Sequence, residues 1–146
     1  MISGLNYPRG LRWNFEKISL FITNNRYIKE VKFDEKASVT KNVNLAGSTS
    51  SGNVDGTPSQ ARFSYPYDMA PLLKGDEVIA DYGNARLRII DTNVNQTHTI
   101  WLTGASSAIN KNVYSVLPVR DDLYLGYSQI IYKLSGESSS RCILHH

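Results

Sequence analysis

Histidine and cysteine, two of the side chains that most often hold zinc in proteins, are sparse in this 146-residue chain. His98, His145 and His146 do not have the spacing of a zinc site, and Cys142 is the only cysteine. His98 stands between two threonines on a predicted strand, where a solvated imidazole is the ordinary outcome. We therefore expect these residues to bind no metal, and we expect no cofactor. A single cysteine also excludes an internal disulfide.

The run Asp91-Thr92-Asn93-Val94-Asn95 has the alternating oxygen-bearing side chains with which a calcium-binding loop begins. Such a loop needs glycine at its sixth position and glutamate at its twelfth. This chain has Gln96 and Leu102 at those positions. We therefore interpret residues 91–95 as a polar hairpin turn.

A second polar stretch, Gly47-Ser48-Thr49-Ser50-Ser51-Gly52, has serines but not the strand–serine–helix elbow of a hydrolase. It also lacks the Gly-Lys-Ser/Thr ending of a phosphate-binding loop. No pair of acidic residues stands out for acid–base catalysis, although carboxylates on different strands can meet in the folded chain. We predict a flexible connecting loop here, and a protein that is not an enzyme.

Basic and tyrosine side chains recur along the chain and could together form a nucleic-acid-binding surface. The residues concerned are Lys29, Lys32, Arg62, Arg86, Arg88 and Arg120, with Tyr27, Tyr67 and Tyr82. The net charge is only +3, and Glu30, Asp81 and Asp91 stand near the basic positions, which favours local ion pairs. We therefore do not expect nucleic acid as the partner.

The elements that must position these side chains recur as three similar units. Tyr7-Pro8 and Tyr65-Pro66 each begin a short apolar strand, which is followed by a charged turn, a second strand, a polar corner and two further strands. A third, degenerate copy begins at Tyr114. The later strands of the units are predicted at residues 19–23, 27–33 and 40–45, at 77–81, 85–90 and 97–102, and at 123–126, 130–134 and 141–144. Short strands with frequent turn signals and no helical periodicity predict an all-β fold.

The polar corner of the second unit, Asp81-Tyr82-Gly83-Asn84, has a recognisable turn chemistry. Glycine takes positive φ without steric cost and asparagine tolerates the left-handed region, so we predict a tight turn with positive φ at Gly83. Asp81 can accept hydrogen bonds from backbone N–H groups, or pair with Arg86 or Arg88. The first unit keeps Asn25 in register with this corner.

The second unit and the connection before it resemble the NHL repeat, a β-propeller blade. The landmarks are an L-A-G-S strand end (45–48), a D-G turn (55–56), an A-R-F-x-x-P segment (61–66) and a D-x-G-N-x-R-L-R turn (81–88). The resemblance implies one segment of propeller blades over residues 1–146, with blades at about 7–47, 63–103 and 112–145. We then expect Phe63 to anchor the second blade in the core and Trp101 to end its outer strand.

Six blades are usual in the NHL family, so three blades imply half of a ring. Either the chain is part of a longer protein, or two copies close the ring as a homodimer. The resemblance also implies a non-catalytic scaffold whose loops bind a partner, most simply another protein.

Two alternative functions stay open. One is a propeller enzyme of the amidating-lyase or lactonase-like kind, whose metal site lies outside this chain. The other is an RNA-binding NHL module. The sequence contains neither a signal peptide nor a run of about eighteen apolar residues. If the chain is complete we therefore expect it in the cytoplasm, without a membrane partner.

Overall fold

The computed structural model of this chain describes all residues except 1, 16, 73–74, 101–111, 139–140 and 146. The described residues form three four-stranded antiparallel sheets. Sheet 1 contains β1 (Pro8–Asn14), β2 (Ser19–Asn24), β3 (Tyr27–Phe33) and β4 (Val39–Gly47). Sheet 2 contains β5 (Pro66–Pro71), β6 (Glu77–Asp81), β7 (Arg86–Asp91) and β8 (Gln96–Ile100). Sheet 3 contains β9 (Ser115–Val119), β10 (Asp122–Tyr127), β11 (Ile130–Ser138) and β12 (Arg141–His145).

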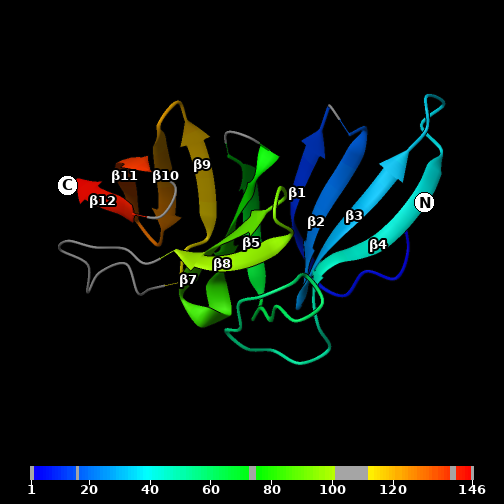
Figure 1. The fold of residues 1–146 in the computed structure, drawn as a ribbon, viewed down its shortest axis with the longest axis horizontal. Coiled ribbons are helices and arrows are strands. Elements are labelled where there is room, and N and C mark those ends of the chain that lie inside the picture. Colours follow the sequence, from blue (N-terminus) through cyan, green and yellow to red (C-terminus); the bar gives the residue numbers. More distant parts are fainter. Residues whose placement is uncertain (1, 16, 73–74, 101–111, 139–140, 146) are drawn as a thin grey trace.

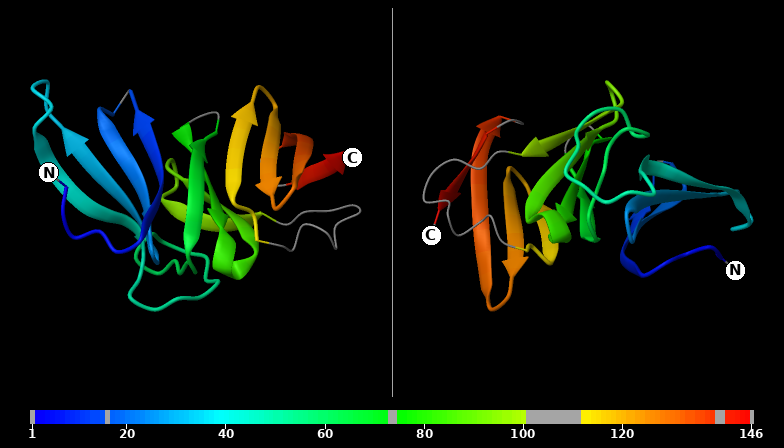
Figure 2. Two further views of the ribbon diagram at one scale, coloured as in Figure 1. Left: turned by 180° about the vertical axis from the view of Figure 1, so that it is seen from behind. Right: turned by 90° about the horizontal axis from the view of Figure 1, so that it is seen from below.

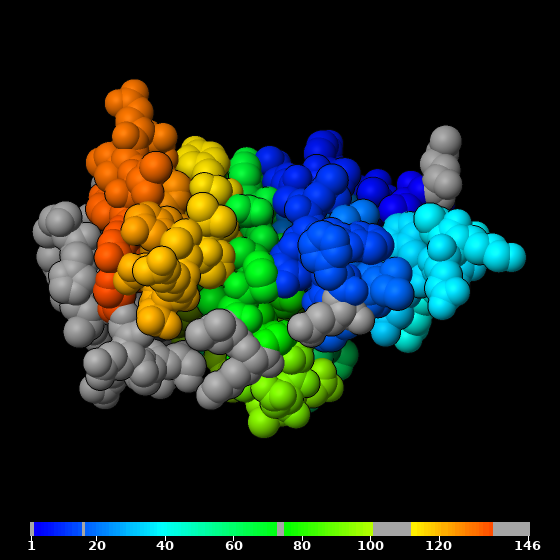
Figure 3. All heavy atoms as spheres, turned by 90° about the horizontal axis from the view of Figure 1, so that it is seen from above, coloured from blue at the N-terminus to red at the C-terminus, as the bar shows by residue number. Residues whose placement is uncertain are grey.

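The sheets follow one another in chain order across the molecule, and the view from above shows the same order (Figures 1 and 3). The first strands of the three sheets lie next to one another, since β1 contacts β5 and β5 contacts β9 (Figure 2). Within each sheet the strands run antiparallel in the order of the chain. The starts of the first strands therefore lie at the same end as the corners that follow the second strands. We call this the corner end; it is the lower edge of Figure 1.

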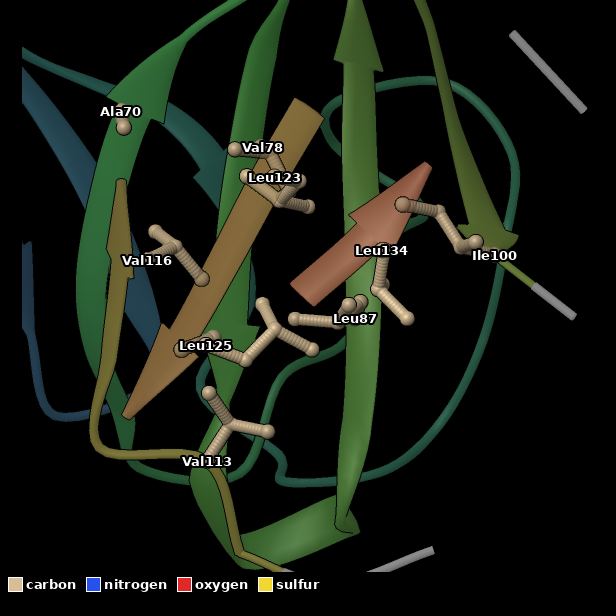
Figure 4. Packing of buried hydrophobic residues seen from close by; sticks show 10 residues of the cluster. Ala70, Val78, Leu87, Ile100, Val113, Val116, Leu123, Leu125 and Leu134 are labelled. Carbon is tan, nitrogen blue, oxygen red and sulfur yellow. The ribbon is translucent and has the colours of Figure 1, made fainter. Parts of the chain in front are cut away.

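Two apolar clusters join the three sheets, one on each face of sheet 2. Alternation along β6 explains this, because Ile79 points towards sheet 1 while Val78 and Ala80 point towards sheet 3. The cluster between sheets 1 and 2 contains Phe21, Ile28, Ala46, Ala61, Phe63, Met69, Ile79 and Ile90. The cluster between sheets 2 and 3 contains Ala70, Val78, Ala80, Leu87, Ile100, Val113, Val116, Leu123, Leu125 and Leu134 (Figure 4).

The predicted all-β fold of three four-stranded units is confirmed. β3 and β6 have the limits expected from the sequence, and Phe63 is fully buried in the core as predicted. Trp101, expected to end the outer strand of the second unit, lies outside the described residues. Among the residues that the structure describes, no helix is long and apolar enough to cross a membrane.

The connection between sheets 1 and 2, which contains the predicted loop at residues 47–52, forms several backbone hydrogen bonds. Gly56 forms a backbone bridge with Thr97 on β8, and Val54 forms one with Arg62. Earlier in the segment, the Gly47 amide donates to the carbonyl of Pro58 at 2.9 Å. Gly47, at one end of the predicted loop, is thus bonded within the connection, and Gly56, beyond the loop, is bonded to β8 at the edge of sheet 2.

Candidate functional site

A buried arginine fixes the corner of sheet 2. Arg88 on β7 has no solvent exposure; its Nη1 donates to Asp81 Oδ2 at 3.0 Å and its Nη2 to Asp55 Oδ1 at 2.7 Å. The same nitrogens donate to the carbonyls of Arg62 at 2.9 Å and Val54 at 2.7 Å. Arg88 therefore ties the connecting segment to the middle sheet.

The two carboxylates that Arg88 holds have different surroundings. Burial raises the pKa of Asp81 to about 6, although bonds from Asn84, the Ser64 amide and Arg88 lower it. Partial burial also opposes the ionisation of Asp55, but two bonds from Thr99 and the charge of Arg88 outweigh it and lower its pKa. These partners belong to the connecting segment, the corner and β8, so the contacts hold these three parts of the chain together.

The turn at this corner is built differently from our prediction, and positive φ at Gly83 is wrong. Tyr82–Asn84 form a short 3-10 helix, η2, and the left-handed residue is Ala85, with φ of 52°. Gly83 is needed for another reason. A Cβ at this position would lie 2.5 Å from the carbonyl oxygen of Ser64, which accepts the Gly83 amide at 2.7 Å.

Asn84, Arg86 and Asn25, the other residues predicted at blade corners, make local contacts or turns. The side-chain amide of Asn84 donates to Asp81 Oδ2 and to the Gly52 carbonyl, each at 2.7 Å. Arg86 donates to the carbonyl of Ala85 at 3.1 Å, so Arg88 is the arginine bonded to Asp81. In sheet 1, Asn25 takes positive φ (57°) in the turn between β2 and β3.

A buried ion pair between sheets 1 and 2 was missed by the sequence reasoning. Arg12 Nε on β1 lies 3.2 Å from Glu77 Oε2 on β6, and the Glu77 side chain is only 2% exposed. Burial raises the pKa of Glu77 to about 7, although the charges of Arg12 and Lys17 lower it. A carboxyl so enclosed has no access to a substrate in solution. No local signal identifies the pair, because its members are far apart in the sequence.

Three tyrosine rings and an arginine meet at the corner end; we call Arg9, Tyr67, Tyr82 and Tyr114 the tyrosine cluster. The Tyr67 and Tyr82 ring centroids are 4.2 Å apart, and the Tyr114 ring lies 5.6 and 5.0 Å from them. The Arg9 guanidinium lies over the Tyr67 ring at 3.9 Å from its centroid. The cluster joins all three sheets, through β1, β5, η2 and the residue immediately before β9.

Backbone contacts between the first strands hold this cluster in place. Gly10, next to Arg9, lets β1 approach β5, since a Cβ there would lie 2.8 Å from the carbonyl oxygen of Tyr67. Thr23 accepts the Gly10 amide at 2.7 Å and donates to the same carbonyl at 3.2 Å. On the other side, the Val116 amide of β9 donates to Asp68 Oδ2 at 3.0 Å.

Two further tyrosines at the corner end have strained backbones. Tyr7 and Tyr65 stand immediately before the prolines that begin β1 and β5, and their φ angles are 54° and 50°. Left-handed backbone at a bulky residue costs about 1–3 kcal/mol, and such residues gather at functional positions. Both side chains are exposed, so the strain does not serve core packing.

The tyrosine cluster has surface chemistry suited to binding. The Tyr82 and Tyr114 hydroxyls are 3.4 Å apart, and this hydrogen bond lowers the pKa of Tyr82 and raises that of Tyr114. The sequence singled out Tyr67 and Tyr82 but not Arg9 or Tyr114. For Tyr114 the usable signal was its place immediately before a first strand, because equivalent positions of repeated units gather at one end.

Other candidate sites carry less chemistry. The described residues contain no group of three His, Cys, Asp or Glu side chains that could hold a metal ion. His98 is exposed on β8, and Asp91 accepts the amides of Asn93 and Val94, as expected for a polar turn. A hollow of about 550 Å³ lies between the end of β4 and residues 57–59, with Tyr27 as its one titratable lining residue.

These features define the class of protein. The three antiparallel sheets, with their first strands innermost, form the fold of part of a six-bladed β-propeller. No family model matches the chain, and no curated protein does.

Several solved structures share the fold. A protein of unknown function from Bacteroides thetaiotaomicron is similar with a TM-score of 0.73 and 17% identity, over 90% of this chain and 36% of that one. An auxiliary nutrient binding protein from the same organism gives 0.65 and 15%, over 80% and 34%. A luciferin-regenerating enzyme gives 0.62 and 17%, over 92% and 47%. The chain thus spans between a third and a half of these proteins, and identities this low show the fold alone.

Proposed function

We propose that this chain is a non-catalytic binding module, built from NHL-type propeller blades, that engages a protein partner through the tyrosine cluster. The observation that carries the proposal is the meeting of three tyrosine rings and an arginine at the corner end. Tyrosine and arginine are enriched among the residues that dominate binding energy at protein interfaces. Arg9 and Tyr114 are exposed, and Tyr67 and Tyr82 are half-buried, so the cluster is both supported and reachable.

The cluster is also organised before any partner binds. Each ring contacts two others, and the Tyr82–Tyr114 hydrogen bond fixes the hydroxyls. Rigid side chains lose little conformational entropy on association, so more of the contact energy contributes to affinity. Arg9 adds a positive charge beside the rings, which suits a partner segment with acidic and apolar side chains.

The fold by itself leaves the function open, because it is shared with a nutrient binding protein and a luciferin-regenerating enzyme. The enzyme alternative requires a metal site from residues other than those described, because these contain no group of three His, Cys, Asp or Glu side chains that could hold a metal ion. The RNA alternative would use the same rings for base stacking, and it predicts a steep loss of affinity with salt.

A displayed library of random peptides tests the proposal without assuming which protein is the partner. Peptides selected on the parent protein are measured against Tyr114→Ala and Arg9→Ala by fluorescence polarisation. We expect each substitution to weaken binding about tenfold, as loss of a central contact usually does. Lys36→Ala is the matched control, since it removes an exposed positive charge from the turn between β3 and β4 at the opposite end.

Selected peptides that bind all four proteins equally would show that the tyrosine cluster is not the binding site. A pool of random single-stranded RNA is tested in parallel. Salt-sensitive RNA binding that depends on Tyr114, without peptide binding, would replace the protein-partner proposal with the RNA alternative.

A further inference from the structure

Sheet 1 leaves an apolar face uncovered on the side away from sheet 2. Phe21 packs between the two sheets, so the next residue, Ile22, and its cross-strand partner Leu11 point to the opposite face. Ile22 itself is only 1% exposed, so the uncovered part of this face lies along β1. Leu11 is 64% exposed, and Trp13, two residues along β1, lies on the same face and is also exposed. Phe15, in the turn that follows β1, is 85% exposed.

Sheet 3 has a corresponding face at the other end of the row. Val116 packs against sheet 2, so Leu117 and Val119 point away from it. On β11, Tyr132 packs towards sheet 2 and Ile131 points away. Leu117 is 60% exposed and Ile131 is 74% exposed.

Sheet 2 shows how apolar sheet faces are covered in this fold. Both of its faces are apolar and both are buried, each by a neighbouring sheet. The end units of a repeat structure remain soluble when their outer faces are polar, and here both outer faces carry large exposed apolar side chains. Burial of one leucine or isoleucine contributes about 1.5–3 kcal/mol, so covering both faces would release a large free energy.

The lengths of the similar solved structures bear on what covers the two outer faces. This chain spans 47% and 48% of two of the similar solved structures, and 34% and 36% of two others. Two copies therefore supply the same length of chain as one protein of the first pair. The outer face of sheet 3 also has no unbalanced charge at Lys133, whose Nζ lies 2.9 Å from Asp122 Oδ2 on the same face. The charge of Lys133 is therefore balanced within sheet 3.

We infer that two copies of this chain close a ring of six sheets, in which the outer face of sheet 1 of each copy packs on the outer face of sheet 3 of the other. A two-fold axis relates the copies and generates the interface twice. The ring brings the tyrosine clusters of both copies to one central channel. The inference is independent of the proposed function, because it uses the outer faces and not the cluster.

Sedimentation equilibrium at micromolar concentrations tests the ring. The chain has a mass of 16.4 kDa, and we expect twice that mass for the parent protein. Leu11→Asp and Ile131→Asp each alter both copies of the interface, so each variant should sediment as a monomer. Val94→Asp, at an exposed apolar residue in the turn of sheet 2, is the control and should leave the dimer intact.

Mixing the two monomeric variants identifies which faces pair. In the mixed dimer one interface combines both aspartates, while the other combines an unaltered sheet 1 face with an unaltered sheet 3 face. An equimolar mixture should therefore regain dimers that neither variant forms alone. A monomeric parent protein, or a mixture that stays monomeric, would overturn the inference. If either variant fails to fold by circular dichroism, Leu117→Asp replaces it on sheet 3 and Trp13→Asp replaces it on sheet 1.

Discussion

Replacement of Arg88 by methionine should destabilise the chain by about 4 kcal/mol. The substitution keeps most of the side-chain volume but removes both bonds to carboxylates and both bonds to carbonyls. Asp81 has no solvent exposure, and a buried charge that loses its partner costs about 3–5 kcal/mol. The Asp55 side chain is 45% exposed and regains water, so it adds little.

This loss is measured by urea unfolding, monitored by far-UV circular dichroism at a fixed protein concentration. The free energies of unfolding of parent and variant can be compared where their m-values agree. Asp55→Asn is the matched control and should cost at most about 1 kcal/mol. In the double variant Arg88→Met/Asp81→Asn, removal of the second charge should recover about 2 kcal/mol. A loss below about 1 kcal/mol for Arg88→Met, or additive effects in the double variant, would refute this account of the corner.

Four further substitutions test other parts of the structure. Burial lifts the pKa of Glu77 from 4.5 to about 7, so the parent should lose stability as pH rises through this window. Glu77→Gln lacks this loss, and its stability relative to the parent should rise by about 3 kcal/mol between urea titrations at pH 4.5 and pH 7.5. Gly83→Ala should cost about 1–3 kcal/mol because its Cβ would overlap the Ser64 carbonyl. Ala85→Gly, at positive φ, should change stability by no more than about 0.5 kcal/mol. Thermal melts of both variants distinguish a need for close approach at residue 83 from a need for glycine at the left-handed position. Phe63→Ala should cost about 3–5 kcal/mol in urea unfolding, and a loss below 1 kcal/mol would contradict its place in the core.

The fold could be predicted from the sequence because its signals are local and repeated. Strand composition, turn residues and the repeated Tyr-Pro pairs each act over a few residues, and they predicted three four-stranded units. The limits of β3 and β6 followed from the same patterns. The turn at Gly83 shows where this reasoning fails. Glycine has two uses, positive φ and close approach, and the sequence does not distinguish them.

The candidate site depends on contacts between units, which no local pattern encodes. Arg9 and Tyr114 are separated by most of the chain, yet both reach the Tyr67 ring. The same holds for Arg12 and Glu77, whose pairing requires sheets 1 and 2 to be in place. Prediction of these contacts needs the packing of one sheet on the next, which strand patterns within a unit do not give.

The buried charges of this chain stabilise its fold, whereas its exposed apolar and aromatic side chains are available for binding. At the corner of sheet 2 the buried charges find their partners within the described chain, so that region is framework. Large apolar side chains on two outer faces are instead exposed, and so are Arg9 and Tyr114 of the tyrosine cluster. Burial of these side chains in a complex would therefore stabilise association. The outer faces provide broad apolar area suited to a second copy, and the tyrosine cluster provides a compact, rigid surface suited to a different partner.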